Sequence, residues 1–211
     1  MGRNERRVIA AWLGRSSIDR VVAIHEAGHA VGLILTAPML GWRHDEVLNR
    51  IEVHATPVAV GVSQATTCGA FLSRPMEDYC RVNHVGRSVD AALFVHMRTA
   101  GLDLTDWFAA RCISSVLASV AEARATGRAV DEVMASDAAD DDLTDVMRHG
   151  NWCGMTTDEI QNAIWDNTAI AQHYIEMPEV WSAILALADK LRPGTMSGLR
   201  ATRIVLEALT A

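Results

Sequence analysis

The chain has 211 residues, half of them hydrophobic, and is therefore long enough to bury a full core as one domain or as a core with a helical extension. A formal net charge of −7 and scattered basic residues exclude a positive stripe that would follow a nucleic-acid backbone. The four cysteines are too widely spaced for a Cys-x-x-Cys pair, so we expect reduced, packed thiols at Cys68, Cys80, Cys112 and Cys153.

Residues 1–16 predict a short N-terminal arm. The apolar run Val8–Leu13 within it is too short for the core of a signal peptide. His25, Glu26 and His29 interrupt the one long apolar stretch, so we expect no membrane span. These features predict a cytoplasmic protein.

The first strong element is a helix from about Ser17 to Ala37. Ser16-Ser17-Ile18-Asp19 has the spacing of a capping box, and Pro38 supplies a stop. Apolar residues recur between these signals at helical intervals, namely Ile18, Val21, Val22 and Leu33. Such a helix would be roughly 30 Å long at 1.5 Å per residue.

The middle of this helix carries His25-Glu26-Ala27-Gly28-His29, an H-E-x-x-H motif. Residues i and i+4 lie on one face of a helix, so His25 and His29 can bind a single metal ion. Glu26 lies beside them and can act as the general base that takes a proton from metal-bound water. The motif predicts a zinc-dependent hydrolase.

The next segments predict a small sheet and another helix. Arg50–His54 alternates apolar and polar residues like a half-buried strand, and Val58–Ser63 reads as a second strand after the turn at Thr56-Pro57. Gly61 within it would allow another backbone to approach closely. A helical stripe over 88–100 places His96 at the edge of the core, where packing explains it better than metal binding.

A helix over 106–126 follows, capped by Thr105 and ended by Gly127. Glu122 lies near its C-terminal end, where the helix dipole disfavours a carboxylate unless a partner holds it. The acidic run Asp137–Asp142 predicts either a solvated loop before the next helix or the source of a missing zinc ligand.

The last 60 residues are helical by pattern. Thr156–Glu159 forms a capping box for a helix to about Glu176, Pro178 begins another helix that ends at Pro193-Gly194, and a final helix runs over 197–209. We expect this part to serve packing and assembly. The predicted organisation is an arm (1–16), a core (17–150) and a C-terminal helical subdomain (151–211) packed on that core. The fold class is mainly α (α+β), a helical zincin-like domain with a small sheet.

A catalytic zinc ion usually has three protein ligands and an open position. A third histidine in the extended pattern H-E-x-x-H-x-x-G-x-x-H is excluded, because Leu35 occupies its position. A glutamate from a later element is an alternative, with Glu46 in an apparent loop as a candidate. Glu122 and the aspartates of the acidic run are the others.

The motif, in the form His25-Glu26-Ala27-Gly28-His29-Ala30-Val31, resembles the peptidase domain of the FtsH-type AAA+ zinc metalloproteases. Further similarity covers about residues 17–211. The segment 51–63 is similar to that family's strand pair, Val120-Ala121-Glu122 to its Ala-Glu helix, and Ala139–Leu143 to the segment that brings its aspartate ligand.

The resemblance implies a zinc metalloprotease that hydrolyses flexible or unfolded polypeptide. By that alignment the third ligand is Asp142, with Asp140 or Asp141 as alternatives. It also implies that substrate binds as an extra strand along Val60, Gly61 and Val62.

The chain departs from the family's pattern in several places. Residues 74–103 look inserted, Ser119-Val120 stands where Gly-Arg usually precedes the Ala-Glu pair, and the segment after the acidic run is shortened. Lys190, the one lysine, has no P-loop around it, so no ATPase module is expected. No apolar stretch is long enough to predict a membrane anchor. Such a peptidase would act on already unfolded chain or with a separate unfoldase or regulatory partner, and could form a homo-oligomer. Two alternatives stay open: a non-enzymatic zinc-binding regulatory or interaction module, and a protease dedicated to one regulatory target.

Overall fold

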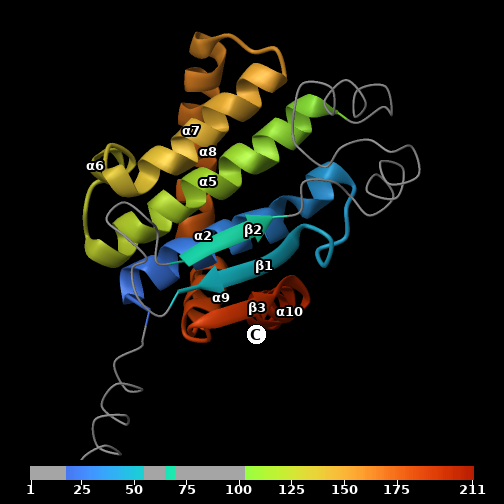
Figure 1. Cartoon of the computed structure of the whole chain (residues 1–211), viewed down its shortest axis with the longest axis vertical. Helices are drawn as coiled ribbons and strands as arrows, with labels where there is room; N and C mark the ends of the chain where they lie inside the picture. The colour runs from blue at the N-terminus through green and yellow to red at the C-terminus, as the bar shows by residue number, and fades with distance from the viewer. Residues whose placement is uncertain (1–17, 55–64, 70–102) are drawn as a thin grey trace, which may run out of the picture.

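The computed structural model describes residues 18–54, 65–69 and 103–211, which form helices around one small sheet (Figure 1). This confirms the expected mainly α (α+β) class. The predicted arm, the strand over 58–63 and the helix over 88–100 lie outside the described residues. The described elements are α2 (Arg20–Thr36), η1 (Ala37–Leu40), β1 (Leu48–Val53), β2 (Ala65–Gly69), α5 (Leu104–Thr126), α6 (Val130–Met134), α7 (Asp137–Trp152), α8 (Thr157–Glu176), α9 (Pro178–Ala188), β3 (Gly194–Ser197) and α10 (Gly198–Leu209).

Helix α2 runs through the centre of the protein. Its N-cap is Asp19, whose carboxylate accepts hydrogen bonds from the backbone N–H groups of Val21 (2.7 Å) and Val22 (3.4 Å). The helix therefore begins at Arg20, later than the predicted Ser17, because Asp19 already satisfies its first donors. By length and composition α2 together with η1 could cross a membrane, and most of this stretch is buried inside the protein.

Helix α5 packs directly along α2, and two glycines of α2 allow the close approach. A Cβ atom on Gly28 would lie 2.7 Å from the Cα atom of Ala118, and one on Gly32 would lie 2.7 Å from the Cα atom of Ser114. Any larger residue would push the two helices apart. The cap of α5 is Asp103 and not the predicted Thr105, because the Asp103 carboxylate accepts from the N–H groups at the helix start.

The sheet has the order β2-β1-β3, and both pairings are antiparallel. Strand β1 agrees with the strand predicted over Arg50–His54. Strand β3 was not predicted. The four residues of β3 carry no strand pattern of their own, and they pair with β1 (Ile51 opposite Met196) because tertiary packing brings the chain end back. Among the described strands, β2 lies at one outer edge, along α2 (Figure 1).

The C-terminal helices pack against different elements of the core. α8 packs on α5, while α9 packs on α2 and on α10, which also contacts β1. The predicted capping box at the start of α8 is confirmed, since Thr156 and Glu159 exchange backbone and side-chain hydrogen bonds. Residues 151–211 therefore contact the core through α8, α9 and α10, while the predicted division of the chain into an arm, a core and a C-terminal subdomain stays a prediction.

Candidate metal centre

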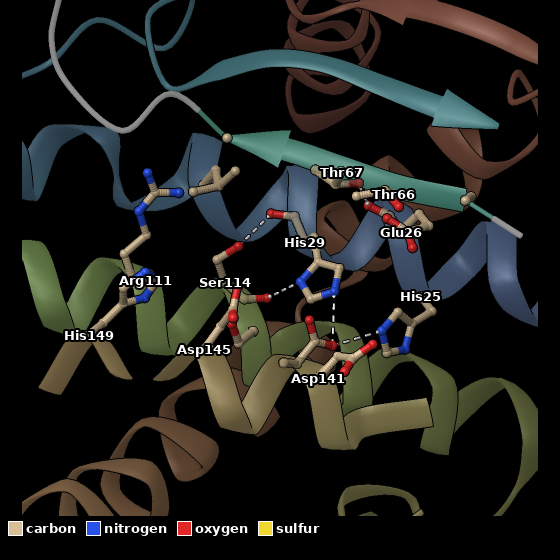
Figure 2. A pocket seen from close by; sticks show the side chains of 15 residues that line it. His25, Glu26, His29, Thr66, Thr67, Arg111, Ser114, Asp141, Asp145 and His149 are labelled. Atoms are coloured by element: carbon tan, nitrogen blue, oxygen red, sulfur yellow. Dashed lines mark hydrogen bonds and ion pairs between the residues drawn. The ribbon is translucent and has the colours of Figure 1, made fainter. Parts of the chain in front are cut away.

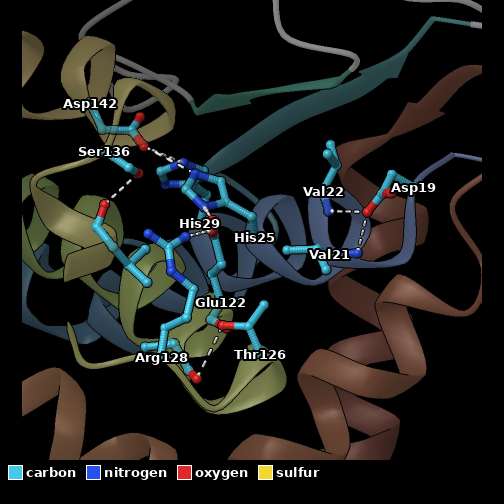
Figure 3. A network of polar contacts seen from close by, with 12 residues as sticks. Asp19, Val21, Val22, His25, His29, Glu122, Thr126, Arg128, Ser136 and Asp142 are labelled. Atoms are coloured by element: carbon cyan, nitrogen blue, oxygen red, sulfur yellow. Dashed lines mark hydrogen bonds and ion pairs between the residues drawn. The ribbon is translucent and has the colours of Figure 1, made fainter.

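The H-E-x-x-H motif lies in the middle of α2, where the histidines are one helical turn apart. The rings of His25 and His29 meet edge to face, with centroids 4.9 Å apart. The Nε2 atoms of both rings point at one oxygen, Asp142 Oδ2, each at a distance of 3.1 Å (Figure 3). The ligand-type atoms of these three residues all lie within 4.8 Å of one another. The structure thus brings the predicted pair together with the predicted aspartate.

Asp142 comes from α7, and the acidic run has a different structure from the predicted loop. Helix α7 begins at Asp137, so the aspartates occupy its first turns rather than precede it. Helical spacing then points Asp142 inward, while Asp140 and Asp141 are exposed. This places Asp142, rather than its neighbours, against the histidines.

Helix α5 holds both imidazole rings in position from behind. Glu122 Oε2 lies 3.0 Å from His25 Nδ1, and the backbone carbonyl oxygen of Ser114 lies 3.1 Å from His29 Nδ1. These oxygens can only accept, so each ring donates from Nδ1, and in the neutral ring the Nε2 lone pair is then the one that can bind a metal ion. Arg128 approaches the other oxygen of Glu122 at 3.5 Å (Figure 3). Its contacts with His25 and Arg128 explain why a carboxylate can lie near the C-terminal end of a helix. Glu122 itself is not a member of the ligand group.

The electrostatics of the site favour a cation. Burial lowers the pKa of His25, but hydrogen bonds to Asp142 and Glu122 outweigh burial and raise the pKa to about 10. Burial in turn raises the pKa of Asp142, but the neighbouring His29 and His25 hold that pKa well below its usual range. Both pKa shifts have the same cause, which is a negatively charged oxygen facing two ring nitrogens in a buried site. The same negative charge would attract a metal ion placed between these atoms.

The three side chains fit a divalent metal ion. Zinc bound to nitrogen and carboxylate oxygen at about 2.0–2.1 Å in a tetrahedron has ligand atoms about 3.3 Å apart. The two nitrogen-to-oxygen distances of 3.1 Å are close to that value. Among the described residues the ligand group has three members, the number that is usual for a catalytic zinc ion, whereas structural zinc sites usually take four protein ligands.

Glu26 lies beside this group and is 5% exposed. Its Oε2 atom is buried and has no hydrogen-bond partner among the described residues. Burying a carboxylate oxygen without a hydrogen-bond partner costs free energy, so we expect Glu26 to have a role beyond packing. Its backbone carbonyl accepts a hydrogen bond from Thr67 Oγ1 of β2 at 3.0 Å, which ties α2 to the edge strand.

A cavity of about 270 Å³ opens onto the site (Figure 2). His25, Glu26, His29 and Asp142 line one part of it, and residues 65–67 and Gly69 of β2 line a side. From the histidines the cavity continues past Ser114 to Arg111 and His149 (Figure 2). The site is therefore a pocket with an edge strand beside it.

Several sequence-based candidates lie elsewhere. Glu46 accepts a hydrogen bond from the backbone of Arg43 in the loop before β1 and is not in the ligand group. Of the cysteines, Cys68, Cys112 and Cys153 are free thiols outside that group, as predicted. Val60, Gly61, Val62, His96 and Cys80 lie outside the described residues, so their predicted roles stay predictions.

Comparison of the chain with known protein families gives no match, and comparison with curated proteins gives no significant similarity. The resemblance to FtsH-type peptidases therefore rests on the residues of the chain itself. The geometry of the site carries the functional argument.

We expect the Glu122→Gln variant to bind zinc about 10- to 100-fold more weakly than the wild type. A neutral amide is a weaker acceptor for His25 Nδ1–H, and loss of such a supporting carboxylate typically reduces metal affinity by that factor. Competition with a chelator of known affinity measures the change. Glu132→Gln is the matched control, because Glu132 also pairs with Arg128 (2.9 Å) but is exposed and is not a member of the ligand group. Equal affinities in the two variants would contradict a supporting role.

Proposed function

We propose that the protein is a zinc-dependent endopeptidase that hydrolyses flexible or unfolded polypeptide. The observation that carries this proposal is the Glu26 side chain, which lines the same cavity as His25, His29 and Asp142 and whose Oε2 atom is buried with no hydrogen-bond partner among the described residues. A metal site that only stabilises a fold has no need of a base beside it. This observation favours an enzyme over a non-enzymatic zinc-binding module.

A zinc ion in this site would supply Lewis acidity, making a water molecule more acidic and stabilising negative charge on the substrate carbonyl oxygen. The residues of the chain transfer the protons and hold the imidazole rings in place. The Glu26 carboxylate accepts the proton of the attacking water and returns it to the nitrogen of the leaving chain as the carbon–nitrogen bond breaks. Glu122 and the Ser114 carbonyl keep the two imidazoles from turning during this exchange.

Substrate would bind in extended form along β2. Among the described strands β2 lies at an edge of the sheet, and an extended peptide can be added to a sheet beside an edge strand. β2 is tied to Glu26 through Thr67 and borders the cavity, so a peptide on its edge would pass the general base. Among the described residues, Ala65, Thr66 and Thr67 border the cavity on this side. The substrate-binding role that the resemblance implies for Val60, Gly61 and Val62 stays a prediction.

The size of the site supports an unfolded substrate. A cavity of about 270 Å³ accepts a few side chains, not a folded surface. Folded targets would require a separate unfoldase or regulatory partner, in keeping with a chain that carries no P-loop motif. We place this activity in the cytoplasm.

The test is cleavage of an intrinsically unfolded protein, reduced β-casein, by the purified chain. We expect cleavage with one equivalent of zinc, loss after dialysis against a chelator, and recovery on adding zinc back. Folded lysozyme with intact disulfides is the substrate control and should stay uncleaved. Zinc-loaded protein that leaves β-casein intact at stoichiometric concentration would overturn the proposal.

A further inference from the structure

The support behind the metal centre continues one residue beyond Glu122. The Oε2 atom of Glu122 lies 3.0 Å from His25 Nδ1, and its other oxygen, Oε1, lies 3.5 Å from Arg128 Nη1 (Figure 3). The Glu122 side chain is only 9% exposed, so each of its oxygens has a partner in a place with little access to water. Arg128 therefore contacts the carboxylate that holds one of the predicted metal ligands.

A glycine at the end of α5 turns the chain so that this contact forms. Along an uninterrupted helix, a residue six positions after Glu122 would lie about 9 Å further along the axis and about 240° round it. Helix α5 instead ends at Thr126, and Gly127 follows with a φ of 72°, in the left-handed region that residues other than glycine rarely adopt. The chain turns back at Gly127, which brings the Arg128 side chain to Glu122.

Glu132 of α6 holds the Arg128 guanidinium on its other edge. Arg128 Nε donates a hydrogen bond to Glu132 Oε1 at 2.9 Å, and Arg128 Nη2 donates to the backbone carbonyl oxygen of Glu132 at 3.3 Å. A guanidinium is planar with its donors in a rigid fork, so holding Nε and Nη2 fixes the direction of Nη1 toward Glu122. Glu132→Gln would retain an oxygen acceptor at both points and should leave Arg128 in place.

The position of Glu122 explains why a cation beside it matters. The carbonyl groups at a helix C-terminus carry partial negative charge and disfavour a carboxylate there. When a metal ion is bound, His25 offers Glu122 only a neutral N–H donor, so the positive charge comes from Arg128. Without that charge, turning the carboxylate toward water would recover its hydration and break its hydrogen bond to His25.

We propose that Arg128 is a positioning residue of the metal centre, which acts through Glu122 to keep His25 directed at the metal ion. Removing Arg128 should therefore weaken metal binding. The sign separates this role from a direct electrostatic one, because loss of a positive charge near the site would by itself strengthen the binding of a cation. The inference rests on the zinc site of the proposed function and not on peptide cleavage.

The zinc affinities of four proteins, measured by competition with a chelator of known affinity, test this role. The four proteins are the wild type, Arg128→Gln, Glu122→Gln and the double variant. We expect Arg128→Gln to weaken zinc binding by about three- to tenfold, less than Glu122→Gln, because Arg128 acts through one more contact. In the Glu122→Gln background, Arg128→Gln should change the affinity by less than about twofold, since residues that act through one carboxylate are not additive.

Two further variants separate positioning from general stability. Arg128→Lys keeps a positive charge for Glu122 but loses the fork, so its zinc affinity should lie between those of the wild type and Arg128→Gln. Arg124→Gln, also near the end of α5, removes a hydrogen bond to the Ile175 carbonyl and a contact with the Trp181 ring. It should lower the melting temperature of the metal-free protein and leave the zinc affinity unchanged. If Arg128→Gln does not fold, Arg128→Lys takes its place in the double-variant comparison.

Three results would overturn the inference: the chain binds no zinc, the Arg128 variants bind zinc at least as tightly as the wild type, or the losses in the two single variants multiply in the double variant. Cleavage of β-casein by the zinc-loaded wild type distinguishes the two proposals. Zinc affinity that depends on Arg128, without cleavage, would keep this inference and lose the proposed function. Cleavage with no dependence of zinc affinity on Arg128 would do the reverse.

Discussion

The Glu26→Gln variant should lose peptide cleavage by about 10²- to 10⁴-fold while its zinc content stays equal to that of the wild type. Glutamine has the same shape as glutamate, but its amide cannot accept the proton of the attacking water. The ligand group of His25, His29 and Asp142 does not include Glu26, so metal binding should not change. The cleavage rate of β-casein and the metal content of dialysed protein measure the two quantities.

The same variant should be at least as stable as the wild type. Glu26 Oε2 is buried without a partner among the described residues, so a neutral amide removes the desolvation cost of a charge. Glu179→Gln is the control for the substitution itself, because Glu179 is exposed at the start of α9 and should tolerate it within about 0.5 kcal/mol and without loss of cleavage. Cleavage at the wild-type rate by Glu26→Gln would refute the assignment of the base.

The second large effect is expected from Asp142→Asn, which should reduce zinc affinity by more than about 100-fold. The carboxylate supplies the only negative charge in the three-residue group, and an amide oxygen is a much weaker zinc ligand. The expected loss exceeds the 10- to 100-fold typical of groups that merely support a ligand. Zinc content after dialysis and competition with a chelator measure the affinity, and β-casein cleavage should fall in parallel.

Asp141→Asn is the matched control for this variant. Asp141 is the adjacent residue, borders the same cavity and is exposed, so its substitution removes the same charge from the pocket without removing a ligand. We expect near wild-type zinc binding there. Zinc should also raise the melting temperature of the wild type and of Asp141→Asn but not of Asp142→Asn, because a ligand stabilises only a state that binds it. The reverse pattern would move the third ligand to Asp141.

Elements with strong local signals were predictable from the sequence. Helix α8 starts at the predicted capping box because Thr156 and Glu159 satisfy helix donors within four residues of chain. Strand β3 was not predictable, because Gly194–Ser197 has no strand pattern and becomes a strand only by pairing with β1. Helix α7 shows a third case, in which the acidic run looked like a loop but forms the first turns of the helix. Negative side chains stabilise a helix N-terminus from within its first turn, so the helix begins at Asp137 and includes the acidic run.

For the site, the sequence by itself determined the positions of His25 and His29 one turn apart and of Glu26 beside them, because helical periodicity is a local property. Only the tertiary structure decided the rest. Asp142, Glu122 and Ser114 lie 117, 97 and 85 positions from the histidines they contact, and no local pattern sets which helix face meets the motif. Two features of the packing set this arrangement. Gly28 and Gly32 let α5 approach α2 to backbone contact, and the first turns of α7 direct Asp142 toward the histidines.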